Sequence, residues 1–197
     1  MTYGTLKRTV LALLDVNAEE QETAGSLLAT VSASFPSLYN TVARKTTQFL
    51  KNIEREVLLS FEPCAGGVCA PLPTDFMAVC EARVFDGGHA RDIEIRGNTA
   101  FIAGGAEGEY TLRYFAYPAP ADGMTDGATV LDFDDFTADT VAYGMAAELC
   151  HSLYPGDMTR YMRLATEYDE RIANAAPRIG ERSVVNRVFG RRRGGVQ

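Results

Sequence analysis

The sequence contains no tryptophan and only two histidines, and these scarcities exclude several chemistries. Histidine is the usual general base at neutral pH. His89 lies in the loop DGGHA, and His151 directly follows Cys150. Adjacent helical residues point about 100° apart, so Cys150 and His151 do not form a nucleophile and its base. No basic region of the body alternates with aromatic residues, as single-strand-binding surfaces do. We expect no catalytic residue, no cofactor and no enzymatic activity.

Long hydrophobic runs are also missing. No stretch approaches the roughly 20 apolar residues of a membrane span. The N-terminal MTYGTLKRTVLALLD has too short an apolar run, and too clear a helical face, for a secretory signal. The glycine-rich GGAEGE lacks the Lys-Ser/Thr pair of a phosphate-binding loop, and we interpret it as a turn. We expect a protein made in the cytoplasm, without membrane contact.

The sequence has only four cysteines, and their spacing raises two hypotheses, free thiols or a metal site. We expect four free thiols packed as small hydrophobic groups. The other hypothesis is a zinc site made of CAGGVC, Cys80 and either His89 or His151. A single closely spaced pair is weak support for a tetrahedral site, so we predict no metal. The four cysteines are Cys64, Cys69, Cys80 and Cys150.

Charge is distributed unevenly along the chain. Residues 178–197 carry six arginines and one glutamate, a net charge of +5, whereas the whole chain has −7, which leaves −12 for residues 1–177. An acidic body disfavours tight binding to nucleic acid. A basic arm suits a carboxylate-lined partner, or a nucleic acid that only the arm reaches.

Apolar spacing predicts helices in the first 60 residues. Residues 5–14 form one amphipathic helix, and a second follows NAEEQE and runs to about Ala33. Pro36 then fits the first turn of a third helix. The stripe of that third helix comprises Leu38, Val42, Phe49, Ile53 and Val57.

The period changes after Phe61, where EPCAGGVCAPLP breaks the helix. Turn signals then separate four β-rich segments at 76–85, 92–95, 99–103 and 109–117. In the last of them Tyr110, Leu112 and Tyr114 share one face. These strands predict an antiparallel sheet folded as a small sandwich or barrel.

The helical period returns from residue 132. Three acids at the helix start, Asp132, Asp134 and Asp135, favour a helix N-terminus over a metal site. Pro177 is expected to close the last helix. The apolar stripe of that helix comprises Met158, Tyr161, Met162, Ala165, Tyr168 and Ile172.

The predicted architecture is therefore α+β: a helical bundle interrupted by an inserted β module, followed by an extended arm. We place N-terminal helices in 1–60, the β module in 61–126, C-terminal helices in 127–177 and the arm in 178–197. The arm is expected to form an anchor strand or short helix that docks on a partner. Its partner-binding residues are Val184, Val185, Arg187, Val188, Phe189, Arg191, Arg192 and Arg193.

Three segments resemble the head-to-tail adaptor (connector) proteins of tailed bacteriophages, including the tail tubular A-like proteins. They are LPTDFMAVCEARVFDGG (72–88), GEYTLRYFAYPAP (108–120) and VAYGMAAELCHSLYPGDMTRYMRLATEYDERI (141–172). In pattern the resemblance covers roughly residues 35–175. The C-terminal stretch is longer and more basic than in the short-tailed branch of the family.

The resemblance implies a structural protein of the virion neck. Adaptors of this type form a ring, usually of twelve copies, between the portal protein and the tail, and the packaged double-stranded DNA passes through without sequence-specific contact. An acidic lumen would repel the DNA backbone, and the arm would anchor to the portal or a neighbouring subunit. The alternative is a small nucleic-acid- or protein-binding module that uses the basic arm.

Overall fold

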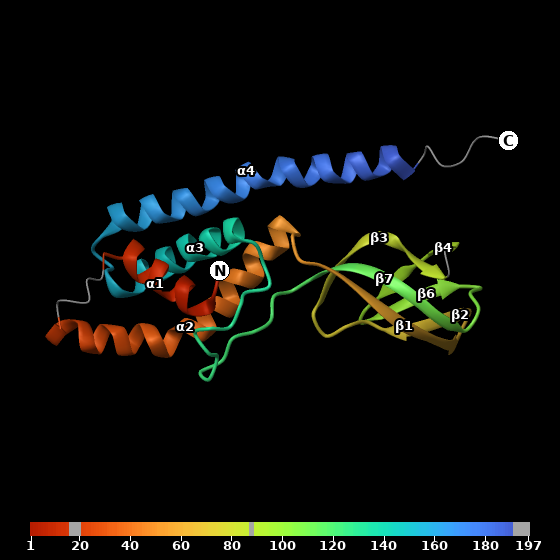
Figure 1. The fold of residues 1–197 in the computed structure, drawn as a ribbon, viewed down its shortest axis with the longest axis horizontal. Coiled ribbons are helices and arrows are strands. Elements are labelled where there is room, and N and C mark those ends of the chain that lie inside the picture. Colours follow the sequence, from red (N-terminus) through yellow and green to blue (C-terminus); the bar gives the residue numbers. More distant parts are fainter. Residues whose placement is uncertain (16–20, 87–88, 191–197) are drawn as a thin grey trace. The chain divides into compact units, whose positions relative to one another are not determined.

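The computed structural model describes residues 1–15, 21–86 and 89–190, with side chains for 1–15, 29, 31–86 and 89–175. Within these ranges the chain is mixed α+β, with four helices and seven strands (Figure 1). It divides into a helical unit, Met1–Leu50 with Pro118–Gln197, and a barrel unit, Lys51–Tyr117. The helices are α1 (Tyr3–Leu13), α2 (Gln21–Leu50), α3 (Asp135–Leu153) and α4 (Met158–Gly190). The strands are β1 (Glu54–Cys64), β2 (Gly67–Pro71), β3 (Phe76–Asp86), β4 (His89–Asp92), β5 (Glu94–Arg96), β6 (Thr99–Ala103) and β7 (Gly108–Ala116).

The barrel unit is a seven-stranded antiparallel sheet, in the order β4-β3-β7-β1-β2-β6-β5, that nearly closes on itself. The two edge strands, β4 and β5, are separated only by Ile93. The Ile93 amide donates to the Ala82 carbonyl of β3 (3.1 Å). One continuous stretch of chain therefore borders both ends of the sheet, and closure leaves little exposed edge.

Alternating side chains fill the barrel. In β1, Leu59 and Phe61 are buried, whereas Leu58, which precedes them, is 57% exposed. Tyr110, Leu112 and Tyr114 of β7 are all buried, which confirms that they share one face and shows that this face points into the barrel. The rings of Phe61 and Tyr110 meet edge to face, with centroids 5.2 Å apart.

The prediction that the third helix runs through Val57 is wrong, because α2 ends at Leu50. Lys51 adopts a left-handed conformation (φ 46°) and ends α2. The apolar residues that follow belong to β1. A spacing of four residues fits both a helix face and, as two periods of two, a strand face, so Ile53 and Val57 are ambiguous by period.

The segment EPCAGGVCAPLP, expected only to break a helix, makes the turn of the β1–β2 hairpin. Gly66 has φ 85°, a conformation that suits glycine. Pro63 pairs with Val68 across the hairpin. The segment predicted at 92–95 is divided between β4 and β5, while the strands at 76–85, 99–103 and 109–117 lie within one residue of the predicted bounds.

In the helical unit, α3 is the central helix. Eleven of its residues are buried, including Val141, Met145 and Leu149. Small residues such as Gly144 and Ala146 let the other helices pack close to it. Asp134 caps its N-terminus, where the carboxylate accepts from the Thr137 amide (2.8 Å), as the acids at the helix start predicted.

The helix break expected near Pro36 is wrong, because α2 is one helix with Pro36 inside it. Figure 1 shows that α2 changes direction near its middle, as an internal proline causes. Packing on both sides of the proline offsets the lost hydrogen bond. Phe35 and Tyr39 both contact the Tyr3 ring of α1 edge to face, with centroids 5.4 and 5.5 Å away.

The last helix does not end at Pro177, and residues 178–190 are helical, so an extended arm beginning at 178 is wrong for this stretch. A proline is only a probable helix boundary, and apolar spacing crosses this one, since Ile172 and Ile179 are seven residues apart. The predicted stripe is also partly wrong. Met158 and Met162 are each 54% exposed, whereas Leu164 is buried with Tyr168.

Candidate functional site

The predicted partner-binding residues lie at the C-terminal end of α4. Val184, Val185, Arg187, Val188 and Phe189 fall in its last two turns, so this segment is a helix rather than a strand. Spacings of four residues join Val184 to Val188 and Val185 to Phe189, which is the spacing of apolar residues in an amphipathic helix. Arg191, Arg192 and Arg193 lie outside the described residues.

Helix α4 is longer than α3, the helix against which it packs in the helical unit. A short turn joins α3 to α4, and the two helices pack together along α3. α3 has 19 residues and α4 has 33. The excess corresponds to about 14 residues, or roughly 21 Å at 1.5 Å per residue. Isolated helices of this length are marginal in water, so the terminal turns are suited to a partner surface.

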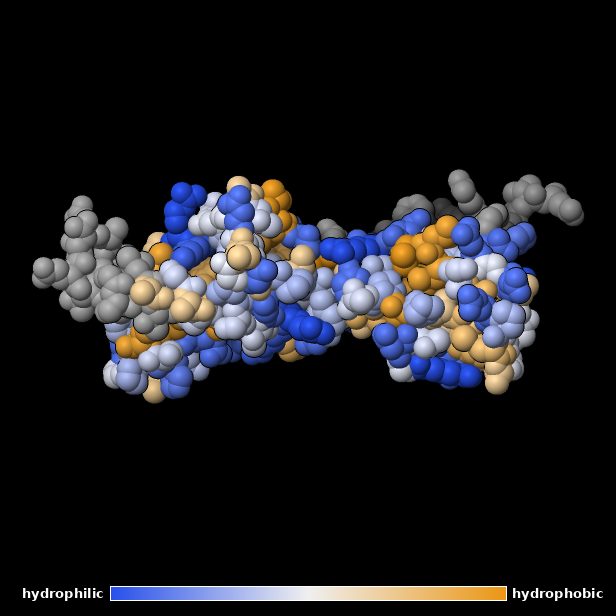
Figure 2. Space-filling view, turned by 90° about the horizontal axis from the view of Figure 1, so that it is seen from below, coloured by the Kyte–Doolittle hydropathy of each residue, from blue (hydrophilic) through white to orange (hydrophobic). Residues whose placement is uncertain are grey.

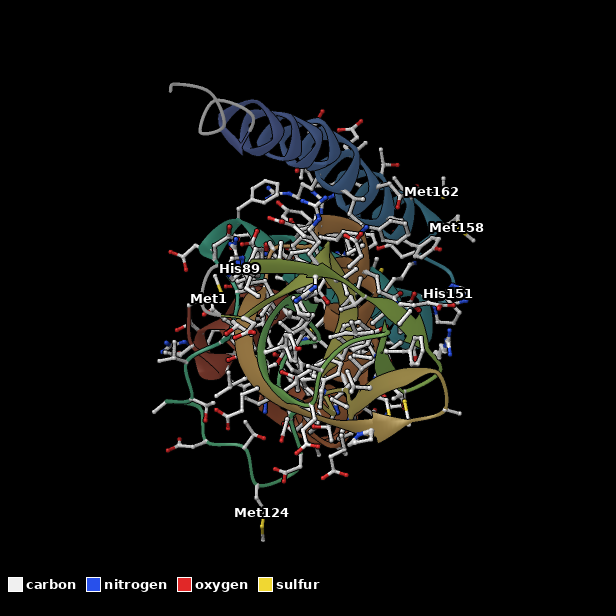
Figure 3. The ribbon with its side chains drawn as sticks, turned by 90° about the vertical axis from the view of Figure 1, so that its right-hand side faces the viewer. Met1, His89, Met124, His151, Met158 and Met162 are labelled. Carbon is white, nitrogen blue, oxygen red and sulfur yellow. The ribbon has the colours of Figure 1, made fainter. Side chains whose placement is uncertain are left out.

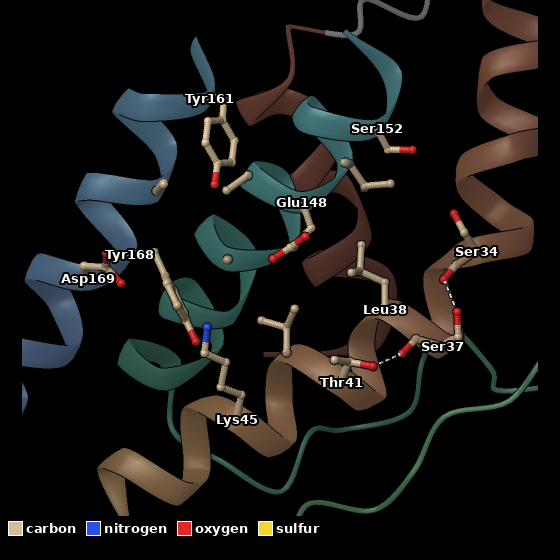
Figure 4. A pocket seen from close by; sticks show the side chains of 15 residues that line it. Ser34, Ser37, Leu38, Thr41, Lys45, Glu148, Ser152, Tyr161, Tyr168 and Asp169 are labelled. Atoms are coloured by element: carbon tan, nitrogen blue, oxygen red, sulfur yellow. Dashed lines mark hydrogen bonds between the residues drawn. The ribbon is translucent and has the colours of Figure 1, made fainter. Parts of the chain in front are cut away.

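A groove lies between α2 and α4, with α3 as its floor (Figure 4). Its volume is about 560 Å³. From α2 it is lined by Leu38, Thr41, Val42 and Lys45, among others. The α3 floor includes Gly144, Ala147 and Leu149, with the exposed Glu148 at its edge, and the α4 wall includes Tyr161, Ala165, Tyr168 and Asp169. We call this the α2–α4 groove.

The α2 wall has hydroxyl groups whose hydrogen bonds are made within the helix. Ser37 donates to the Ser34 carbonyl (2.9 Å), and Thr41 donates to the Ser37 carbonyl (3.0 Å) (Figure 4). These hydroxyls have donated their protons to the backbone, so the wall offers mainly hydrocarbon and acceptor atoms. An apolar ligand surface fits such a wall better than a phosphate or a sugar.

Tyr168 joins the two walls of the groove. Its hydroxyl lies 3.1 Å from the Thr46 hydroxyl of α2, and the Lys45 ammonium lies 5.6 Å from its ring centroid. Burial raises the pKa of Tyr168, the Thr46 hydrogen bond opposes that shift, and the carboxylates of Asp169 and Glu148 add to it. These two exposed acids form a negative rim, while the floor is apolar.

The cysteines and histidines do not assemble into a site. Cys150 is buried and His151 is exposed, so the adjacent pair points in different directions. The His151 ring packs beside Tyr161, with centroids 5.2 Å apart. All four cysteines are free, and a hydrogen bond with Cys69 raises the pKa of Cys64.

Within 1–15, 21–86 and 89–190, no group of three or more His, Cys, Asp or Glu residues could hold a metal ion. Over the same ranges, no helix has an apolar stretch long enough to cross a bilayer.

Several large apolar side chains are exposed and are further candidates for contact with a partner. Figure 2 shows hydrophobic residues reaching the surface of both units. On α4, Met158 and Met162 lie beside one another and point away from the helical unit (Figure 3). Phe49, near the end of α2, is 56% exposed. Exposed pairs of this kind are frequent at protein–protein contacts.

Sequence reasoning missed the groove because its residues come from three helices whose contacts the sequence does not specify. One signal was present: small or short polar residues at helical spacing, Ser34, Ser37 and Thr41 in α2 and Gly144 and Ala147 in α3. Asp75 of the LPTDF motif has a different role. Its carboxylate accepts hydrogen bonds from Arg55 and Tyr114, which ties β1 and β7 to the turn before β3.

Comparison with known proteins gives no family assignment: no protein-family model matches the chain, and no curated protein is similar to it at a significant level.

Proposed function

We propose that this protein is a structural ring adaptor of a tailed-phage virion, placed between the portal protein and the tail around the DNA channel. One observation carries the proposal: α4 continues as a helix past the length of α3, through a segment whose sequence has apolar residues at helical spacing and several arginines. Such a segment gains stability from a partner. The resemblance of the three segments named above indicates which partners these are.

The charge distribution supports the same proposal. Residues 1–177 sum to −12, which would repel the phosphate backbone and let DNA pass through a ring of about twelve copies without specific contact. The terminal arginines suit a carboxylate-bearing partner, since the planar guanidinium binds a carboxylate through two hydrogen bonds. In this proposal the C-terminal segment anchors to the portal or to a neighbouring subunit.

The absence of a catalytic set is consistent with a structural role, within the described residues. A nucleophile, a base and an orienting group would have to lie together. His89 is exposed on β4 and His151 packs on Tyr161, so neither faces a cysteine across a pocket.

The test is assembly onto tailless heads that carry a portal. Purified chain is mixed with such heads and examined by co-sedimentation and negative-stain electron microscopy. We expect a ring at the portal vertex, and no joining when residues 181–197 are deleted, although the shortened chain keeps its circular dichroism spectrum. Salt-sensitive binding to double-stranded DNA by the free protein, with no joining to heads, would instead support the binding-module alternative.

A further inference from the structure

The α2–α4 groove has the size and chemistry to receive the apolar side chains of an amphipathic helix. Apolar residues line its floor and both walls, such as Ala147 of α3, Val42 of α2 and Ala165 of α4, and its rim has the exposed acids Glu148 and Asp169. Helix-in-groove recognition uses apolar anchors at helical spacing, with charged residues at the edge. A volume of about 560 Å³ accommodates a few side chains rather than a whole helix.

The end of α4 has the complementary pattern. Val184, Val185, Val188 and Phe189 recur at helical spacing within the last turns of α4. Arg187 lies within the same turns, and residues 178–197 carry +5. Residues 118–177, which include α3 and the groove-lining part of α4, carry eleven acids and three arginines, or −8. Apolar surface therefore matches between segment and groove, and among the charged lining residues the acids Glu148 and Asp169 outnumber the basic Lys45.

The occupant of the groove cannot be the segment of the same molecule. Tyr161 to Asp169 form one wall of the groove, and they belong to the same continuous helix as the segment. Val184 follows Asp169 by 15 residues, about 22 Å along the axis. A straight helix cannot fold back on its own side, so only another copy can supply the segment.

We propose that the end of α4, residues 184–190, binds in the α2–α4 groove of a neighbouring copy of this chain. The two surfaces are different, so the contact is head-to-tail, and contacts of this kind close into rings when the rotation permits. This inference rests on the proposed ring function and makes it specific: the C-terminal segment joins subunit to subunit.

The direct test uses a fluorescein-labelled peptide of residues 178–197 and the full-length protein, at a concentration where sedimentation shows monomers. We expect saturable binding that weakens with salt. Filling the groove with Ser37→Phe/Thr41→Phe should weaken binding at least tenfold, because both side chains lie on its α2 wall. No binding, or equal binding by this variant, would overturn the inference.

Charge reversal tests the rim. Glu148→Arg/Asp169→Arg should weaken binding about tenfold, and a peptide with Arg187→Glu/Arg191→Glu should restore it. A matched control, Glu62→Arg/Glu107→Arg, reverses two exposed acids of the barrel unit and should leave binding unchanged. Equal loss in the control would show nonspecific attraction and count against the groove.

A second measurement does not depend on the folding of groove variants. Full-length protein with a photoreactive phenylalanine at position 189 is mixed with ¹⁵N-labelled wild-type protein and irradiated. We expect adducts between the two isotopic species at groove residues such as Thr41 and Ala165. Adducts only within one molecule, or only elsewhere, would contradict the proposal.

Binding of the protein to portal-bearing heads distinguishes the proposed adaptor function from the proposed contact in the groove. If wild-type protein does not join portal-bearing heads, the adaptor function fails, and the peptide and cross-linking results still decide the groove. If wild-type and the Ser37→Phe/Thr41→Phe variant join equally well, the groove is dispensable and this inference fails alone.

Discussion

Gly144 of α3 lies directly beneath the ring of Tyr168 of α4, so closely that a Cβ at position 144 would stand 2.8 Å from Tyr168 Cε2. The same Cβ would stand 2.8 Å from Val42 Cγ1 of α2. One glycine thus sets how closely three helices meet at the floor of the groove.

Gly144→Ala is expected to destabilise the helical unit by about 1–3 kcal/mol, the usual cost of overpacking a core. In an exposed helix the same change would stabilise by about 1 kcal/mol. Chemical denaturation followed by circular dichroism measures the difference. Gly156→Ala is the control, since nothing lies within 4 Å of a Cβ there and little effect is expected. Stabilisation by Gly144→Ala would show that the helices separate at no cost.

The hydroxyl of Tyr114 donates to the Asp75 carboxylate (3.0 Å), whereas that of Tyr110 on the same face of β7 donates to the Ala106 carbonyl (2.9 Å). Hydrogen bonds to charged groups contribute about 1.5–3 kcal/mol and neutral ones about 1 kcal/mol. Tyr114→Phe should therefore cost the barrel unit about 1 kcal/mol more than Tyr110→Phe. Urea unfolding of the two variants tests this, and equal losses would mean that solvent screens the Asp75 charge.

The local pattern predicted the strands β3, β6 and β7 and the approximate positions of the helices, but not β1 and β2. Alternation identified the face that Tyr110, Leu112 and Tyr114 of β7 share, and the acids before α3 marked the start of that helix. The boundary between α2 and β1 could not be read in this way, because Phe49, Ile53 and Val57 are four apart and fit either period. What ends the helix is the left-handed backbone at Lys51, and lysine is not a typical residue for that conformation.

Tertiary packing accounts for the remaining differences between the elements predicted from the sequence and those of the structure. Pro36 and Pro177 are both inside helices, which propensity alone disfavours by about 3 kcal/mol each. For Pro36, the contacts of Phe35 and Tyr39 with Tyr3 supply the compensation. The α2–α4 groove depends on which faces of three helices meet, and no single segment carries that information.

Two cysteines should resist alkylation in the folded protein. Burial raises the pKa of Cys80 to about 11, and Cys150 is fully buried with its pKa raised by the same cause. At pH 8 the thiolate fraction of Cys80 is then on the order of 100-fold lower than in the unfolded chain, and the thiolate is the reactive form. Iodoacetamide labelling with peptide mass spectrometry, with and without urea, measures the protection.

We also expect all four thiols to be reduced and free of metal. Elemental analysis should find no stoichiometric zinc, and EDTA should leave the melting temperature unchanged. A loss of stability on chelation would restore the zinc hypothesis for CAGGVC.

Stability should fall at alkaline pH because several buried hydroxyls must ionise on unfolding. Burial is the largest cause that raises the pKa of Tyr3, Tyr39 and Tyr168 in the helical unit, and for Tyr39 the charge of Asp132 adds to it. A group whose pKa is higher in the folded state contributes its full stabilisation below its unfolded pKa, near 10, and loses it as pH rises toward the folded value. The raised thiol pKa of Cys80 has the same sign from about pH 9.

The free energy of unfolding should therefore be flat near pH 8 and decline between pH 9 and 11, by up to about 1.4 kcal/mol per pH unit for each such tyrosine. Tyr39 is the most strongly shifted of the three, so Tyr39→Phe should reduce this slope by the largest amount. Urea titrations at several pH values for wild type and Tyr39→Phe provide the comparison. If the two slopes were equal, the Tyr39 hydroxyl would have to ionise as readily in the folded protein as in the unfolded chain, and its burial against Tyr3 and Phe133 would not hold in solution.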